Sequence, residues 1–461
     1  MIPKNMIHLF VVMGLLAASA FAQQQMPPEG GTPKDFQLPA KTELTLENGL
    51  QVTMIPFGEL PKVTVRLSVR AGNLNEQADQ VWLADLTGDL MTEGTENRSA
   101  LEIAETAAGM GGSVSASVSL DQTLVSGEVL TEFGPQLLEL MADIIQNPVF
   151  PEDAVERLKN DYQRNLSIAK TRAQSLAQEK FDQAMYGDHP YGRVFPTEAI
   201  IQSFNQEMVQ KFYQDNFGAR RSHLYISGKF DAAAMEKAVQ EYFSDWQPGP
   251  EPLILPPEPQ SERVVYLVDR PGAPQSTLYL GLPVIDPTQP DYLKLQVMNT
   301  LLGGYFSSRI TSNIREDKGY TYSPRSSITS HYRDAFWRQA ADVSTDVTGP
   351  ALKEIFYEID RLQNELPTEE ELKGVQNYMA GTFVLRNSDP GSIIGQLSFI
   401  NFHGLPEAYL TEYVKNIHAV TPQDIQEMAQ KYLEDSKMTI VVVGDSKKVK
   451  KQVRKFGKVK M

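Results

Sequence analysis

The order of apolar and polar residues predicts strands and helices that follow one another in the first half of the chain. Short apolar runs have the length of buried strands, and longer segments repeat their apolar residues every three or four positions, as helices do. Strands are expected over residues 52–55 and 63–69, a hairpin over 113–130, and helices over 82–91, 101–110, 133–146 and, as one continuous segment, 151–186.

The second half repeats this order. Strands are expected over 264–268 and 276–282, a helix near 294–302, more strands between 320 and 344, and then helices. Strands mixed with long helices predict an α+β fold in each half.

An internal repeat supports two related halves. Segments of about thirty residues that begin at Ile201 and Ile417 align without a gap at an offset of 216 and end at Gly228 and Gly444. Near the middle lies a Pro-rich stretch that is typical of a semi-rigid linker. The expected domains are residues 41–246 and 263–461, joined by a linker over 247–262.

The first residues have the pattern of an export signal. Lys4 gives a positive start, an apolar run covers 7–18, and residues 20–22 (Ala-Phe-Ala) form a small-x-small cleavage site. This run is shorter than the roughly 20 residues that span a bilayer, so a cleaved signal over 1–22 is expected rather than an anchor. Residues 23–40 are expected to form a disordered lead-in.

The composition of the chain excludes several classes of function. The net charge of −15 argues against a protein that binds the phosphate backbone of nucleic acids. The chain has no cysteine, which excludes disulfides, thiolate zinc sites and a cysteine nucleophile. An exported chain without cysteine fits the bacterial periplasm. The few histidines are scattered along the sequence and are not expected to form a metal centre.

Common nucleotide-binding and hydrolase motifs (GxxxxGK[ST], GxGxxG and GxSxG) are absent, and the segment 301–325 stands out instead. Residues 308–317 are expected to form a helix that ends in a left-handed Gly319. Arg315 would then lie on the last helical turn, and Tyr322 in a strand that starts at residue 320. From these residues alone, Arg315 and Tyr322 are expected to be an ordinary surface Arg and a half-buried Tyr.

Motifs along nearly the whole mature chain resemble one family. They are LENGLQVTMIP from Leu46, MTEGTENRSALEI from Met91, GGSVSASVSLDQT from Gly111, YGDHPYGR from Tyr186, LLGGYFSSRI from Leu301, IREDKGYTYS from Ile314, PTEEEL from Pro367 and VTPQDIQEMAQKYL from Val420. Together they resemble the insulinase/pitrilysin-like zinc peptidases, and in particular their bacterial two-domain subunits. The resemblance implies two homologous domains, each a mostly antiparallel sheet flanked by helices, arranged as a clam-like half of a peptidase chamber.

The zinc motif of that family, H-x-x-E-H, is degenerate here. Counting back from the glycine-threonine pair at 94–95 places Asp85 and Asp89 where the two histidines would stand, and Gly88 where the glutamate that activates water would stand. Two carboxylates suit magnesium or calcium better than zinc. Without a base at residue 88, no proton acceptor would lie beside a bound water.

The family's third zinc ligand is a glutamate seventy-odd residues downstream. Between residues 157 and 178 the only acid is Asp161, so this ligand is expected to be lost as well. The resemblance therefore implies that this chain holds no metal.

A second group of family residues is present. Catalytic assemblies carry an Arg and a Tyr seven positions apart that face the zinc from the second domain, and Arg315 and Tyr322 match this pair. A phenol can donate a hydrogen bond to a developing oxyanion, and loss of such a donor typically costs about 10²–10³ in rate. Gly303 and Gly304 lie in a loop that the family places near the chamber. They are candidate substrate-binding residues, with an ordinary turn as the alternative.

Two further segments are open to more than one interpretation. Residues 113–119 form either an edge strand that can pair with an extended peptide or an internal hairpin strand. The basic tail over 447–460 is expected to be an amphipathic helix, with a solvated basic face or a contact with an acidic partner or membrane surface.

The resemblance predicts a non-catalytic, zinc-free subunit of a heterodimeric periplasmic zinc metallopeptidase. This chain would supply Arg315 and Tyr322 to a homologous H-x-x-E-H-bearing partner that holds the zinc, and would help to enclose peptide substrates. No nucleic acid and no stable membrane insertion are expected. One alternative is a structural or peptide-binding pseudo-peptidase without a catalytic role, and another is an autonomous hydrolase with a remodelled site.

Overall fold

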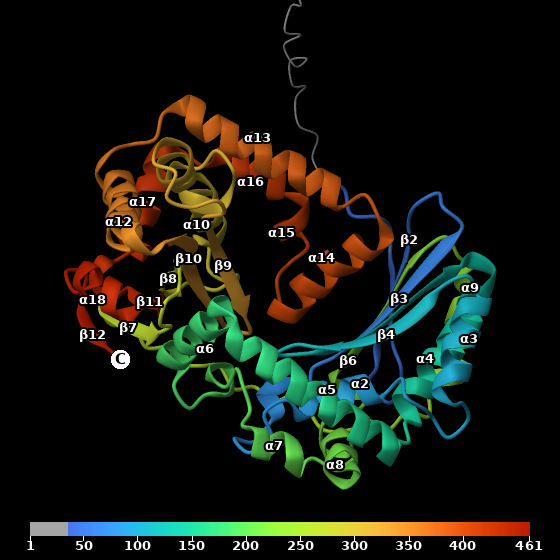
Figure 1. Cartoon of the computed structure of the whole chain (residues 1–461). Coiled ribbons are helices and arrows are strands. Elements are labelled where there is room, and N and C mark those ends of the chain that lie inside the picture. Colours follow the sequence, from blue (N-terminus) through green and yellow to red (C-terminus); the bar gives the residue numbers. More distant parts are fainter. Residues whose placement is uncertain (1–35) are drawn as a thin grey trace, which may run out of the picture. The chain divides into compact units, whose positions relative to one another are not determined.

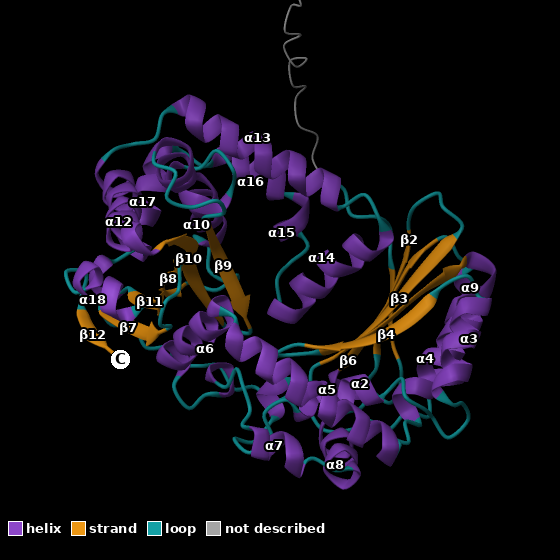
Figure 2. Cartoon of the chain, in the orientation of Figure 1, coloured by secondary structure: helices purple, strands orange, loops and turns teal. Residues whose placement is uncertain are grey.

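Two six-stranded sheets, each covered by helices, make up the chain (Figures 1 and 2). The computed structural model describes residues 36–461, so the expected signal over 1–22 and most of the expected lead-in lie outside the described residues. Residues Asp35–Met461 form one compact unit. The predicted α+β class with mostly antiparallel sheets is confirmed.

The two sheets have the same strand order. The first sheet runs β1 (Thr42–Thr45), β2 (Gln51–Pro56), β6 (Ser222–Gly228), β3 (Lys62–Val69), β5 (Thr123–Leu130) and β4 (Ser113–Val118). The second runs β12 (Lys458–Lys460), β7 (Val264–Asp269), β11 (Thr439–Gly444), β8 (Gln275–Val284), β10 (Asp334–Ser344) and β9 (Arg325–His331). The sheets differ at one edge, where β1 is antiparallel to β2 but β12 is parallel to β7.

The helices follow the same order in each half. In the first half they are α2 (Leu83–Leu90), α3 (Ala100–Gly109), α4 (Gly134–Gln146), α5 (Glu152–Thr171), α6 (Ala173–Tyr186), α7 (Glu198–Ser203), α8 (Gln206–Asn216) and α9 (Ala232–Phe243). In the second half they are α10 (Tyr292–Asn299), α11 (Arg309–Thr311), α12 (Thr348–Asn364), α13 (Glu369–Arg386), α14 (Pro390–His403), α15 (Ala408–Thr411), α16 (Tyr413–Ala419), α17 (Pro422–Tyr432) and α18 (Ser446–Val453). Two π-helical turns cover Thr300–Gly304 and Ser312–Asp317.

The repeat in the sequence corresponds to a repeat in the structure. Helix α8 and helix α17 are related by the offset of 216 at both of their ends, and both precede a buried strand, β6 or β11. Asn205 and Thr421 cap the two helices by accepting a backbone N–H at their first turn.

Each half also packs one helix against the sheet of the other. Helix α6 contacts β8 and β11, and helix α14 contacts the corresponding strands β3 and β6. The opposite face of the first sheet is covered by α4, which packs beside α3 and α9 (Figure 1). Central strands are therefore covered on both faces, which explains why β11 is buried along its whole length and β3 along most of its length.

The expected single helix over 151–186 is wrong, because it is two helices. Arg172 separates α5 from α6 with an extended backbone conformation (φ −90°, ψ 125°). The break turns α6 toward the second sheet, where Ala177 and Phe181 are fully buried.

The first part of the basic tail forms an amphipathic helix, α18, as its spacing predicts, whereas Lys458–Lys460 form strand β12 instead. Val449, Val453 and Phe456 are buried in the second core, while the lysines of α18 face outward. Within residues 36–461, no helix combines the length and the apolar character needed to cross a membrane.

Candidate functional site

Helix α2 carries the degenerate zinc-motif residues Asp85, Gly88 and Asp89. The helix begins after Trp82, which has a left-handed backbone (φ 75°), and its first turn is held by Glu76. The backbone N–H of Ala84 donates to Glu76 Oε1 at 2.8 Å. A carboxyl group at the N-terminus of a helix satisfies a free N–H, so Glu76 has a structural role.

Asn73 joins Glu76 to Asp85. Its side-chain amide donates to Asp85 Oδ2 at 2.6 Å and to Glu76 Oε1 at 3.1 Å. Burial raises the pKa of Glu76 to about 8, and it also raises the pKa of Asp85, with Asp89 adding to the latter shift by repulsion. At neutral pH, Glu76 is therefore mainly protonated.

Asp89 is held from helix α5. The Tyr162 hydroxyl donates to Asp89 Oδ2 at 2.7 Å, and Tyr162 is buried. Tyr162 lies 73 residues after Asp89, so a phenol occupies the part of α5 from which the third zinc ligand of the family would come. The neighbouring Asp161 is ion-paired with Arg164 at 2.9 Å on the same helix.

Gly88 packs closely against strand β4. A Cβ atom at this position would lie 2.5 Å from Val118 Cγ2, which is closer than real side chains approach. A glutamate at residue 88 would therefore require Val118 to move.

These residues do not fit a zinc ion. Zinc sites use three or four firm ligands, usually with imidazole, whereas Asp85 and Asp89 already accept hydrogen bonds from Asn73 and Tyr162. Across the described part of the chain, no group of three or more His, Cys, Asp or Glu residues is arranged to hold a metal ion.

Arg315 and Tyr322 lie next to each other. The Arg315 guanidinium carbon is 4.9 Å from the centroid of the Tyr322 ring and 4.4 Å from that of Phe306, so the cation lies against two aromatic rings. Both rings are largely exposed, Tyr322 at 80% and Phe306 at 62%. The only charged partner of Arg315 among the described residues is the adjacent Glu316, at 3.1 Å. Phe306 was not singled out from the sequence, although it lies in the LLGGYFSSRI motif.

The expected strand at residue 320 is wrong. Gly319 has the predicted left-handed backbone (φ 62°), but the Tyr320 N–H bonds back to the Ile314 carbonyl, and Thr321 forms only an isolated bridge to Val343. Pro324 has no N–H to give to a sheet, and β9 begins directly after it at Arg325. Tyr322 thus lies in an exposed loop rather than half-buried in a strand.

Gly303 and Gly304 lie in a π-helical turn and not in a loop. A Cβ atom on Gly303 would lie 2.6 Å from Ser326 Oγ and 2.8 Å from Gln339 Oε1, so this glycine permits close packing against β9 and β10. Gly304 lines a cavity that is described below.

Strand β4 is both an edge strand and half of a hairpin. It pairs with β5 and is the last strand of its sheet, so both interpretations of residues 113–119 are correct in part. Its free edge can pair with an extended peptide.

The expectation that the histidines are scattered is wrong in three dimensions. The rings of His189 and His331 each lie 4.6 Å from the ring of Tyr191, and His331 and His403 line one cavity. Burial lowers the pKa of His331 and of His403 to about 4, so both are neutral near pH 7. No spacing in the sequence predicts this cluster, because its members lie on segments that meet only in the folded chain.

Two related proteins and two solved structures resemble this chain. It is 22% identical to "Uncharacterized zinc protease YmxG" of Bacillus subtilis (86% of this chain, 97% of the relative) and 23% identical to "Non-peptidase homolog YmxG" of Helicobacter pylori (85% and 91%). The peptidase M16 inactive domain from Pseudomonas fluorescens aligns with a TM-score of 0.80 at 24% identity (88% and 98%). The periplasmic protease PqqL from Escherichia coli aligns with a TM-score of 0.76 at 16% identity (93% and 50%). These structural likenesses establish the fold.

Two family patterns match consecutive parts of the sequence. The one described as insulinase (peptidase family M16) matches residues 59–196, and the one described as peptidase M16 inactive domain matches residues 203–379. Together they span more than half of the chain. The chain therefore belongs to the insulinase, or M16, family of zinc peptidases and is a two-domain member without the H-x-x-E-H motif.

Proposed function

We propose that this chain is a non-catalytic, zinc-free subunit of a two-subunit zinc metallopeptidase. In this proposal a homologous partner with an intact H-x-x-E-H motif holds the zinc, and this chain supplies Arg315 and Tyr322 to the partner's active site. The proposed location is the periplasm, on the strength of the export signal expected over 1–22.

One contrast carries the proposal. At the place of the zinc motif, half-buried Asp85 and exposed Asp89 accept hydrogen bonds from Asn73 and Tyr162 of this chain. Tyr322, by contrast, is 80% exposed, and the half-buried Arg315 lies beside its ring. The exposed phenol, with the guanidinium next to it, is accessible to a group outside this chain. Their chemistry suits the oxyanion and carbonyl groups of a peptide under hydrolysis.

Strand β4 provides a second support. It lies against α2, with Val118 next to Gly88, and its outer edge pairs with no other strand of the described sheet. An extended peptide that adds to this edge would run past the position of the zinc motif.

The test is peptide hydrolysis by the chain together with its partner. With an H-x-x-E-H-bearing homologue, Arg315→Ala and Tyr322→Phe should each lower kcat/KM by about 10²–10³, the usual loss for one oxyanion donor. Arg164→Ala, which removes an exposed Arg from α5, is the matched control and should leave turnover unchanged. A partner that is fully active alone, or an Arg315→Ala pair with normal turnover, would refute the proposal.

A second candidate function is a peptide-binding pseudo-peptidase with no catalytic role. The cavity beside Gly304 favours it, because a chain can bind a peptide there without any zinc. The name of the Helicobacter pylori relative, a non-peptidase homolog, also favours this candidate. Peptide binding without an effect on any homologous peptidase would select this candidate.

A further inference from the structure

A cavity of about 470 Å³ opens between α10, α13, α14 and the segment 409–413 in the second half of the chain. This volume lies within the usual range for small-ligand sites. It is separate from Arg315 and Tyr322, neither of which lines it.

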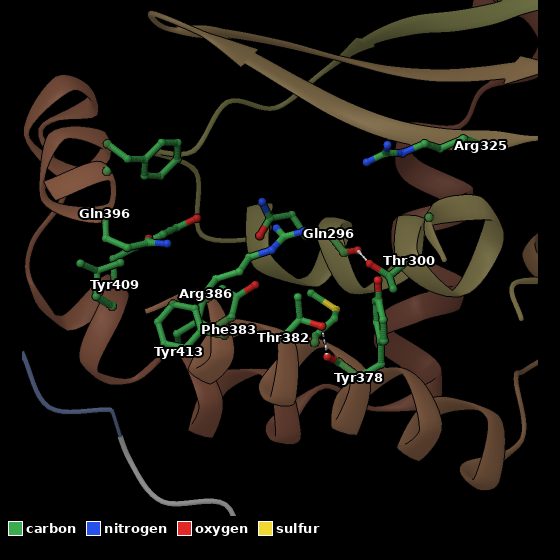
Figure 3. Close-up of a pocket in the computed structure, with 15 residues that line it drawn as sticks. Gln296, Thr300, Arg325, Tyr378, Thr382, Phe383, Arg386, Gln396, Tyr409 and Tyr413 are labelled. Carbon is green, nitrogen blue, oxygen red and sulfur yellow. Dashed lines mark hydrogen bonds between the residues drawn. The ribbon is translucent and has the colours of Figure 1, made fainter. Parts of the chain in front are cut away.

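Two arginines give the cavity its charge. Arg325, at the start of β9, and Arg386, at the end of α13, both point toward the middle of the cavity (Figure 3). Neither guanidinium forms an ion pair or a hydrogen bond with any residue in 36–461, and the lining residues in that range include no Asp or Glu. The cavity thus presents two positive charges with no internal counter-charge.

Gln296 adds a polar group with an unused acceptor. Its side-chain oxygen is buried and has no hydrogen-bond partner among the described residues, and the side chain lies near the Arg386 guanidinium in the cavity wall. Buried acceptors are nearly always satisfied in folded proteins, so this oxygen is suited to an N–H from a ligand or to a water.

The rest of the wall combines aromatic side chains with threonines, glycines and Gln396. Phe383, Phe399, Tyr409 and Tyr413 are among the aromatic residues, and burial raises the pKa of Tyr413 to about 12. Such a wall accepts an apolar side chain.

We propose that this cavity binds the carboxylate of a peptide, with Arg325 and Arg386 on the carboxylate, Gln296 on a neighbouring N–H, and the aromatic wall around an apolar side chain. A C-terminal residue carries all three groups together, and an acidic side chain offers the same carboxylate. The inference deepens the proposed function by naming a feature of the substrate, and it rests on that function only in taking a peptide as the ligand.

Calorimetric titration of the purified chain, without a partner, tests the site. The probes are acetyl-Ala-Ala-Phe with a free carboxylate, its C-terminal amide, and acetyl-Ala-Glu-Phe-amide, whose only carboxylate is on a side chain. The free acid should bind at least about tenfold more tightly than its amide, because a charge-assisted hydrogen bond is lost in the amide. If the glutamate peptide binds as tightly as the free acid, the cavity recognises an acidic side chain. If the glutamate peptide does not bind, the cavity recognises the C-terminal carboxylate.

Variants locate the binding. Arg325→Ala and Arg386→Ala should each weaken binding of the free acid by about 10- to 100-fold, and Gln296→Ala by less. Lys373→Ala removes one positive charge from the exposed side of α13 and should change nothing. Both arginines are exposed, so their replacement should leave the thermal midpoint unchanged.

Equal binding of acid and amide, or unchanged binding by both Arg variants, would overturn the proposal. These outcomes are distinct from failure of the subunit function, because the titration contains no partner and no zinc. Conversely, Arg315→Ala should leave the titration unaltered.

Discussion

Helix α2 and the segment around residue 315 are the two regions that we propose as counterparts of the family's catalytic groups, and they differ in what their polar atoms contact. Around α2, Glu76 is buried, Asp85 is half-buried and Asp89 is exposed. They accept hydrogen bonds from Ala84, Asn73 and Tyr162, respectively. Around residue 315, a guanidinium and a phenol lie against each other at the surface.

Under the proposed function, one fold has lost a metal site and kept a pair that faces the substrate. Acidic side chains that already accept hydrogen bonds stabilise α2 and have less capacity left for a ligand. Exposed groups contribute little to stability, so their arrangement is more informative about function.

The largest expected effect is the pH dependence that Glu76 gives to stability. The pKa of Glu76 is about 8 in the folded chain and near 4.3 when unfolded, so between these values the unfolded chain releases a proton that the folded chain keeps. Stability should therefore fall as pH rises through this window, by about 1.4 kcal/mol per pH unit from this group. Urea unfolding at pH 5, 6, 7 and 8 measures it.

Glu76→Gln keeps an acceptor for the Ala84 N–H and removes the titration, so its stability should fall less steeply with pH. Glu132→Gln, at an exposed glutamate, is the control and should follow the unmodified chain. Identical slopes for Glu76→Gln and the unmodified chain would show that Glu76 is ionised in the folded state.

A smaller effect is expected from Tyr162→Phe. It removes the hydroxyl that donates to Asp89, and loss of a hydrogen bond to a charged group costs about 1.5–3 kcal/mol. Burial already raises the pKa of Asp89, and loss of the Tyr162 donor raises it further. The lost hydrogen bond stabilises the ionised form of Asp89, so the destabilisation should be greater at pH 8 than at pH 5. Urea unfolding at both values measures it, with Tyr357→Phe at an exposed tyrosine as the control.

The smallest effect on stability is expected at Arg315, which is half-buried, and at the exposed Tyr322. Arg315→Ala and Tyr322→Phe should each change the free energy of unfolding by no more than about 0.5 kcal/mol. Loss of the cation–π contact between the two side chains adds a modest further change. Thermal melting checks this. A loss above 2 kcal/mol would mean that the pair holds the fold together, and the contrast with α2 would disappear.

The sequence by itself determined the strand and helix order of both halves, because apolar spacing and the 216-residue repeat are local signals. It also located α2, Gly319 and the amphipathic tail. The break at Arg172 was missed because the apolar spacing continues across it and only packing of α6 against the second sheet reveals the turn.

Only the tertiary structure decided which polar groups meet. Tyr162 lies 73 residues from Asp89, and Arg386 lies 61 residues from Arg325, so no spacing rule brings either pair together. The exposure of Tyr322 likewise depends on Pro324 and on where β9 begins to pair with β10. Burial and long-range hydrogen bonding are properties of the packed chain, and they distinguish the hydrogen-bonded acids at α2 from the exposed Tyr322 beside Arg315.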